Sequence, residues 1–247
     1  MDVVQVIEKL KSVIFFSLFL NLISPCFAGN DLLKDLEGEW ISKKYLEHIT
    51  QTRSPRKAIK EHKYPAIIIK EKGSSLQVML IINFHEGVWY EIKRVEVFSK
   101  GIVYKIYLSE VDGMPGYSYS MIIEKKKNNN SLKVSVHSDR GSYEITQEEY
   151  VKANPSVENV INRRVLEGRY TDERGRLFLF GKDLTAVWPG KKFKYTICID
   201  IMSDVDCFYE VDEKGRGLNR FLFEWKINSL VIKRDIDGHK LFELRKK

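Results

Sequence analysis

Alternation of apolar and polar residues with a period of two runs through most of the chain after residue 64. In segment 76–84 every second residue is apolar, and segments 102–109, 117–124 and 132–137 repeat the pattern. Such alternation, rich in β-branched and aromatic residues, predicts antiparallel strands that each have one buried face. Turn signals rich in glycine, asparagine and aspartate separate these segments at intervals of roughly 10–15 residues. This spacing favours a meander that closes as a barrel or pairs as a sandwich.

Residues 43–63 interrupt the alternation and predict two short helices. An apolar stripe at helical spacing begins at Tyr45, and Ser54-Pro55 offers a capping serine followed by proline in the first helical position. We therefore expect a strand at 38–42, two short helices, and then the first long alternating strand. In this order the helices form a helix-turn-helix lid after the first strand.

A further helical segment at residues 156–165 marks the expected domain boundary. We expect a β-barrel domain over residues 29–153 and a second β-rich domain, barrel or sandwich, over residues 154–247. A single continuous large barrel is the alternative. Segments 36–40 and 166–170 share the pattern Leu-Glu-Gly-x-aromatic, and each would begin one block of strands. This echo fits either a diverged duplication or a chance match of a short motif.

The first 28 residues have the composition of an export signal. Lys9 and Lys11 give a basic start, residues 13–23 form an apolar run followed by a proline, and Ala28 is a small residue at the cleavage position. The run is too short for a membrane span, which needs about 20 apolar residues, although a retained anchor is the alternative. We therefore expect removal of residues 1–28 and a periplasmic or secreted protein that is not integral to the membrane.

The chain carries a formal net charge of +7, with basic and acidic residues interspersed. The densest lysine clusters, at 125–127 and 191–194, adjoin turn signals and are typical of solvated loop tips. The other interpretation is a loose attraction to an anionic envelope surface such as lipid headgroups. Nucleic acid is not an expected partner, because the chain carries an export signal and no recognisable recognition helix.

Past the export signal two cysteines remain, Cys198 and Cys207. They flank a tight turn near Met202-Ser203, and a turn centred there places the two cysteines opposite each other on paired strands. An exported pair at this spacing favours a disulfide over two free thiols. The closed loop is short, so the bond would contribute modest stability and mainly fix the register of the hairpin.

No motif in the sequence indicates a catalytic, metal or cofactor site. His85-Glu86 would pair a base with a carboxylate, but adjacent strand residues face opposite ways and the following glycine favours a hairpin tip. Asp200, Asp204 and Asp206 lack the spacing of a calcium loop and are typical of a charged hairpin end. The histidines show no zinc-ligand spacing, and nucleophile, phosphate-loop and dinucleotide motifs do not occur. We therefore expect a protein that is not an enzyme and has no cofactor.

The opening of the chain resembles the calycin barrels, which include the lipocalins and the intracellular fatty-acid-binding proteins. Gly38-x-Trp40 looks like the Gly-x-Trp of their first strand, where the indole closes one end of the barrel, and the order of strand, helical lid and strand is similar. The resemblance covers roughly residues 35–150 and implies a lidded antiparallel barrel that binds a small apolar ligand. The chain departs from the family at residues 143–147, where the Arg-x-Tyr that reads a ligand carboxylate is missing.

Aromatic residues on the alternating strands provide the candidate ligand-binding positions. Uninterrupted alternation places Tyr90 and Arg94 on one face, so that one guanidinium projects from an apolar row. A buried arginine needs an anionic partner, so Arg94 would receive a ligand carboxylate or phosphate, unless it lies at the barrel rim. The expected ligand-binding residues are Trp40, Tyr90, Arg94, Tyr104, Tyr117 and Tyr119.

These patterns lead us to expect an exported, non-catalytic binding protein for a small apolar or amphipathic, lipid-like molecule. The alternative is an interaction or structural protein of the cell envelope, with barrels filled by their own side chains and basic loops that contact an envelope component. An eight-stranded barrel is just wide enough for either purpose.

Overall fold

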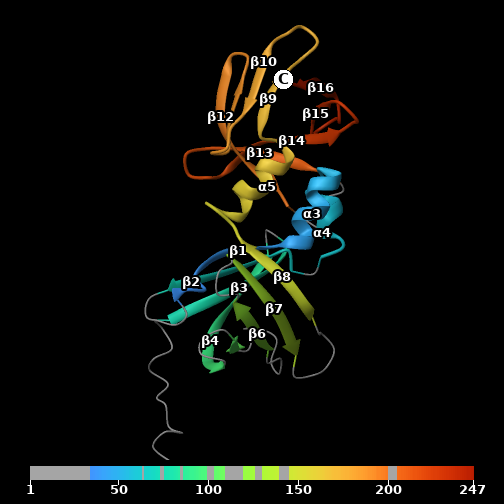
Figure 1. The fold of residues 1–247 in the computed structure, drawn as a ribbon. Helices are drawn as coiled ribbons and strands as arrows, with labels where there is room; N and C mark the ends of the chain where they lie inside the picture. Colours follow the sequence, from blue (N-terminus) through green and yellow to red (C-terminus); the bar gives the residue numbers. More distant parts are fainter. Residues whose placement is uncertain are drawn as a thin grey trace, which may run out of the picture. The chain divides into compact units, whose positions relative to one another are not determined.

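The computed structural model describes residues 34–62, 64–72, 75–83, 86–98, 103–108, 119–125, 130–138, 145–199 and 205–247. Residues 36–247 form one compact unit, which contains the helices and strands labelled in Figure 1. The expected export signal, residues 1–28, lies outside the described residues, as does the expected turn at Met202-Ser203.

Two closed antiparallel barrels of eight strands each make up this unit, so the chain is mostly β, as its alternation predicts (Figure 1). In the first barrel each strand pairs with its neighbours in the sequence, and β8 returns to β1 to close the ring. Its strands are β1 (Gly38–Ser42), β2 (Ala66–Lys72), β3 (Ser75–Asn83), β4 (Glu86–Phe98), β5 (Val103–Leu108), β6 (Tyr119–Lys125), β7 (Ser131–Ser138) and β8 (Ile145–Lys152).

Two helices, α3 (Lys43–Thr52) and α4 (Pro55–Ile59), separate β1 from β2 and confirm the predicted order. Ser42 ends β1 and caps α3, because its hydroxyl oxygen accepts a hydrogen bond from an amide of the first turn at 3.1 Å. Ser54 caps α4 in the same way at 3.2 Å. Between them Arg53 adopts a left-handed backbone conformation, with φ at 51°, and ends α3.

A third helix, α5 (Val157–Val165), leads from β8 into the second barrel and confirms the helix predicted from the apolar stripe. In the second barrel β16 returns to β9 to close the ring, so the region is neither a sandwich nor part of one large barrel. Its strands are β9 (Gly168–Thr171), β10 (Leu177–Phe180), β11 (Thr185–Trp188), β12 (Lys191–Cys198), β13 (Cys207–Val211), β14 (Gly217–Trp225), β15 (Leu230–Arg234) and β16 (Lys240–Lys246).

The first barrel fills the described part of its inward face mainly with aliphatic side chains. In β5 every second residue is buried, and the same alternation holds in β7. Val78 in β3, Ile106 in β5 and Val134 in β7 are each at most 1% exposed. Antiparallel pairing places these residues beside other buried aliphatic residues on the neighbouring strands.

The second barrel, in contrast, packs aromatic rings against one another. The ring of Phe180 lies 5.6 Å from that of Tyr195 and 5.8 Å from that of Phe208, centroid to centroid. These separations fall within the favourable range for edge-to-face contact. The other buried rings of this barrel are those of Tyr170, Phe178, Trp188, Phe193 and Phe223. The second barrel is therefore filled by its own side chains.

Both barrels begin with the same hydrogen bond, formed within the repeated Leu-Glu-Gly-x-aromatic motif. The indole Nε1 of Trp40 donates to the carbonyl of Leu36 at 2.8 Å. The hydroxyl of Tyr170 donates to the carbonyl of Leu166 at 2.7 Å. In each case a large buried side chain on the first strand ties back to the residue four positions earlier, which brings the entering chain against the end of the barrel.

The glycine of the motif has a similar backbone conformation and a similar close neighbour in both barrels. Gly38 and Gly168 have φ of 132° and 155°, conformations that side chains rarely adopt. A Cβ at either position would lie 3.0 Å from the Cε atom of a lysine on the last strand of its barrel, Lys152 or Lys246. Two closed barrels of equal strand number that start in the same way favour duplication over a chance match.

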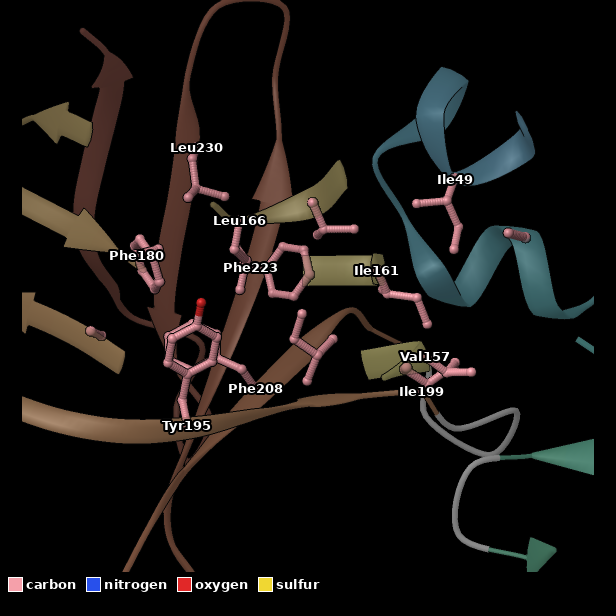
Figure 2. Packing of buried hydrophobic residues seen from close by; sticks show 14 of the residues in the cluster. Ile49, Val157, Ile161, Leu166, Phe180, Tyr195, Ile199, Phe208, Phe223 and Leu230 are labelled. Atoms are coloured by element: carbon pink, nitrogen blue, oxygen red, sulfur yellow. The ribbon is translucent and has the colours of Figure 1, made fainter. Parts of the chain in front are cut away.

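One hydrophobic core joins the three helices to the interior of the second barrel. In Figure 2, Ile161 of α5 is seen between Ile49 of α3 and Phe223 of β14. Polar contacts fix α5 on both sides: the Val157 amide donates to the Glu39 carboxylate of β1 at 2.7 Å. The α5 residue Glu158 accepts a hydrogen bond from the Ile197 amide of β12 at 3.0 Å. The helix thus belongs to the packing of both barrels.

Candidate functional site

Three of the expected ligand-binding residues lie on the inward face of the first barrel. Trp40 in β1, Tyr90 in β4 and Tyr104 in β5 are buried. Each lies opposite a buried aliphatic residue of a neighbouring strand. The structure therefore brings these three aromatic residues to one interior, and their role in ligand binding stays a prediction.

The other expected residues differ in how far the structure describes them. Tyr119 begins β6 opposite Leu108, and its side chain lies outside the described part. Tyr117 lies outside the described residues altogether.

Arg94 has a backbone pairing that departs from the expected alternation, its side chain lies outside the described part, and its role in ligand binding stays a prediction. The pairing of β4 with β5 shifts between Ile92 and Arg94, which places Arg94 opposite Tyr107 on the half-exposed face of β5. Beyond the shift, Val95 takes the position opposite the buried Ile106. A β-bulge adds one residue to a strand and reverses its alternation. A glycine often marks such a bulge in the sequence, but none is present at this point.

A polar cluster lies at the end of the first barrel where β1 gives way to α3. Its centre is Glu148 of β8, whose side chain is 14% exposed and which lies opposite the buried Val134 of β7. The hydroxyl of Ser42 donates to Oε1 of Glu148. The Nδ1 atom of His62 lies 3.8 Å from the same oxygen. The Glu148 carboxylate is therefore surrounded by apolar residues and has two polar partners, Ser42 and His62.

The cluster extends through α3 toward a second histidine. The Nδ1 atom of His48 lies 3.2 Å from Oε2 of Glu61, and the rings of His48 and His62 are 6.1 Å apart. The ring of Tyr45 lies 5.8 Å from that of His62. Beside the cluster, the hydroxyl of Tyr150 donates to a backbone carbonyl at 2.8 Å. Helix α3 and strand β8 together position these groups at one end of the lumen.

Burial sets the protonation of this end of the barrel. It lowers the pKa of His62, although the Glu148 carboxylate opposes that shift. Burial raises the pKa of Tyr45 well above its ordinary value, and the charge of Asp206 adds to the rise. The Tyr45 hydroxyl has no hydrogen-bond partner among the described residues. A neutral imidazole therefore adjoins the Glu148 carboxylate, and the neutral phenol of Tyr45 packs against that imidazole.

The arrangement suits polar recognition better than nucleophilic catalysis. The hydroxyl of Ser42 donates to Glu148 and accepts from the helix that it caps, so its proton is directed away from His62. Among the described residues, no group of three or more His, Cys, Asp or Glu is placed to hold a metal ion. Sequence reasoning missed the cluster, because His62 and Glu148 are far apart in the chain and neither belongs to a motif.

Two further sequence expectations concern the surface. Lys192 and Lys194 lie exposed at the start of β12, close to the turn at residues 189–190 as the sequence suggested, and Lys191 pairs with Glu210 at 2.6 Å. The strand begins earlier than the turn signal suggested.

Within the described ranges, no helix has the length and apolar character that crossing a membrane requires.

No protein-family model, curated protein sequence or solved structure matches the chain. The likeness to calycins is therefore one of architecture, since two closed antiparallel barrels of eight strands are consistent with a calycin-like fold.

Proposed function

We propose that the first barrel binds one small apolar or amphipathic molecule and catalyses no reaction on it, in the periplasm or outside the cell. The contrast between the two barrels carries this proposal. Both have eight strands, yet the first is lined mainly by aliphatic residues and the second is packed with rings. Several strands of the first barrel are also longer, such as β4 with 13 residues against 4 in β10. Longer walls and smaller side chains leave more interior volume for the same number of strands.

The polar end of such a ligand is expected at Glu148. A carboxylate accepts hydrogen bonds and repels another anion, so a hydroxyl or an amine suits this position better than a fatty-acid carboxylate. His62 and Ser42 hold the carboxylate in place from two directions. A site formed around the Glu148 carboxylate therefore favours ligand groups opposite in charge to those that an inward-facing Arg94 would favour.

Displacement of a fluorescent fatty-chain probe tests the binding proposal. Met121→Trp places an indole on the inward face of β6, whereas Ile122→Trp alters the adjacent half-buried position on the same strand. We expect probe binding to the unmodified protein, its loss in Met121→Trp and its retention in Ile122→Trp. Both variants are first checked for an unchanged cooperative unfolding transition. Absence of probe binding, or equal binding by both variants, would contradict the proposal.

A second series tests the polar end by comparing the unmodified protein with Glu148→Gln. At equal chain length, a long-chain alcohol or amine should displace the probe at lower concentration than the corresponding carboxylate. Glu148→Gln should remove that preference, since the amide no longer repels an anion. An unchanged ranking in Glu148→Gln would show that the carboxylate does not contact the ligand.

The alternative, an interaction or structural protein of the cell envelope, draws support from the second barrel. Its interior is occupied by its own rings, and lysines of β12 are exposed at its surface. A protein with both barrels filled would bind neither the probe nor any alcohol, and it would associate with anionic envelope material through these lysines. The same two titrations therefore discriminate between the functions.

Export is part of the proposal and rests on two features. The leader has the composition of a signal peptide, and the structure joins Cys198 to Cys207 in a disulfide. Such bonds persist in oxidising compartments. Recovery of the protein from the periplasm or medium, beginning at Gly29, is the expected result of fractionation and N-terminal sequencing.

A further inference from the structure

A cleft of about 350 Å³ lies between the α3–α4 region and the second barrel, away from the lumen of the first. One wall consists of the junction between the two helices, from Thr52 to Lys57, and the other of residues 205–206, which precede β13, together with β14 and β15. Its volume falls within the range of small-molecule sites, which occur preferentially between packed units of this kind.

Basic side chains dominate the charged lining of this cleft. Four cations face it, and two carboxylates accompany them. The cations are Arg53, Arg56, Lys57 and Lys233, and the carboxylates are Asp206 and Glu224.

Both carboxylates are already engaged by the protein. Asp206 accepts a hydrogen bond from the Arg56 amide at 3.0 Å and another from the Ser54 hydroxyl. Glu224 accepts one from Lys233 at 3.0 Å. Among the described residues, neither Arg53 nor Lys57 forms an ion pair. In the described lining of the cleft, four cations therefore accompany two carboxylates, an excess of two positive charges.

The cleft also has a rigid apolar side. The guanidinium of Arg53 lies over the ring of Trp225, 4.3 Å from its centroid. The indole Nε1 donates to the carbonyl of Val165 at 2.9 Å, which fixes the ring. Leu222 and Phe223 continue this apolar wall. Arg53 has a left-handed backbone conformation and ends α3. Its guanidinium extends from this helix end to the indole.

We infer that this cleft binds the phosphate group of a phosphate monoester whose organic part is small and apolar. A monoester carries between one and two negative charges near neutral pH, which matches the excess charge of the lining. Arginine guanidinium groups bind phosphate oxygens in pairs, and lysines add point charges. The wall of Leu222, Phe223 and Trp225 receives the organic part. This site is independent of ligand binding in the first barrel.

Calorimetric titration with phenyl phosphate at physiological ionic strength tests the inference. We expect saturable binding of one molecule per chain, with inorganic phosphate binding more weakly because it lacks the apolar part. Lys57→Gln, a change at an exposed side chain, should weaken binding about tenfold, and Arg53→Gln/Lys57→Gln more strongly. Lys192→Gln/Lys194→Gln removes the same charge from β12 and should leave the affinity within about twofold.

The phosphate could also belong to a lipid, so a second arm uses vesicles. Phosphatidate carries a monoester headgroup, and phosphatidylcholine vesicles serve as the reference. Vesicle binding that depends on Arg53 and Lys57 but not on Lys192 and Lys194 supports the site and identifies a lipid as the source. Equal loss in both double variants, or no saturable binding of phenyl phosphate or phosphatidate by a protein that unfolds cooperatively, overturns it.

Discussion

Asp206 provides one of the polar contacts between the second barrel and the helices α3 and α4. It precedes β13 and accepts a hydrogen bond from the Arg56 amide at the start of α4. Burial raises the pKa of Asp206, and the hydrogen bonds from Ser54 and Arg56 oppose that rise. Sequence reasoning assigned it to a charged hairpin end, because the groups that donate hydrogen bonds to its carboxylate lie some 150 residues away in the chain.

Replacement of Asp206 separates its hydrogen bonds from its charge. Asp206→Ala leaves the Arg56 amide without its acceptor, and we expect the free energy of unfolding to fall by about 1–3 kcal/mol. Asp206→Asn keeps an acceptor oxygen and removes a buried charge, so its loss should be smaller. Urea unfolding of the two variants measures the difference. Equal losses would mean that the contact contributes through charge alone.

His62 makes the stability of the first barrel depend on pH. Its pKa is lowered in the folded protein, mainly by burial, with His48 and Lys44 adding to the shift and Glu148 and Glu61 opposing it. The unfolded chain therefore takes up the proton first as the pH falls below the ordinary value of 6.5. Because the unfolded state then binds more protons, the free energy of unfolding decreases as the pH drops through this region.

The measurement compares unfolding free energies between about pH 7.5 and pH 5.5 for three proteins. His62→Gln should reduce the decrease seen in the unmodified protein, since a glutamine does not titrate. His239→Gln changes an exposed histidine and serves as the control, with an unchanged decrease. If His62→Gln leaves the pH dependence intact, another group is responsible for it.

At the scale of elements, the hairpin of β12 and β13 is fixed by its disulfide. Cys198 lies directly opposite Cys207, with the two Cα atoms 5.1 Å apart, which confirms the predicted bond and register. The bond lies one residue from Asp206, so the register it fixes also sets the contact with α4.

Removal of this bond should have a limited effect on stability. Cys207→Ser is expected to lower the free energy of unfolding by no more than about 3 kcal/mol, because the closed loop is short. The unmodified protein should be about two mass units lighter than its reduced form, which mass spectrometry measures. Labelling of both cysteines as free thiols in exported protein would contradict the bond.

At the scale of the whole molecule, the two barrels depend on the shared core to different degrees. Residues 154–247 retain α5 and a barrel filled with rings. Residues 36–153 retain the first barrel. In this fragment, however, apolar residues such as Ile49 and Ile59 are exposed, because the core around α5 into which they pack is missing. Burial of apolar side chains is the main stabilising term, so the fragments should differ.

Expression of the two fragments tests this dependence. We expect residues 154–247 to unfold cooperatively on heating, with a near-ultraviolet circular dichroism signal from the packed rings. Residues 36–153 should be less stable or less soluble by themselves. A stable first fragment together with an unfolded second one would reverse this assignment.

The sequence by itself determined the local features of this protein. Alternation with a period of two fixed the strands, Ser42, Ser54 and Pro55 marked the helix starts, and the spacing of Cys198 and Cys207 indicated their pairing. Each of these depends on residues that are close in the chain, so their side chains and backbone dihedrals carry the information directly.

Only the tertiary structure decided the features that need distant residues. Closure into two barrels depends on the pairing of β1 with β8 and of β9 with β16, and no local pattern distinguishes that from a sandwich. The bulge before Arg94 reversed an alternation that the sequence left unbroken. The Glu148 cluster and the basic cleft likewise assemble from segments far apart in the chain. Contacts of this kind are set by packing and charge in three dimensions, which a one-dimensional pattern does not specify.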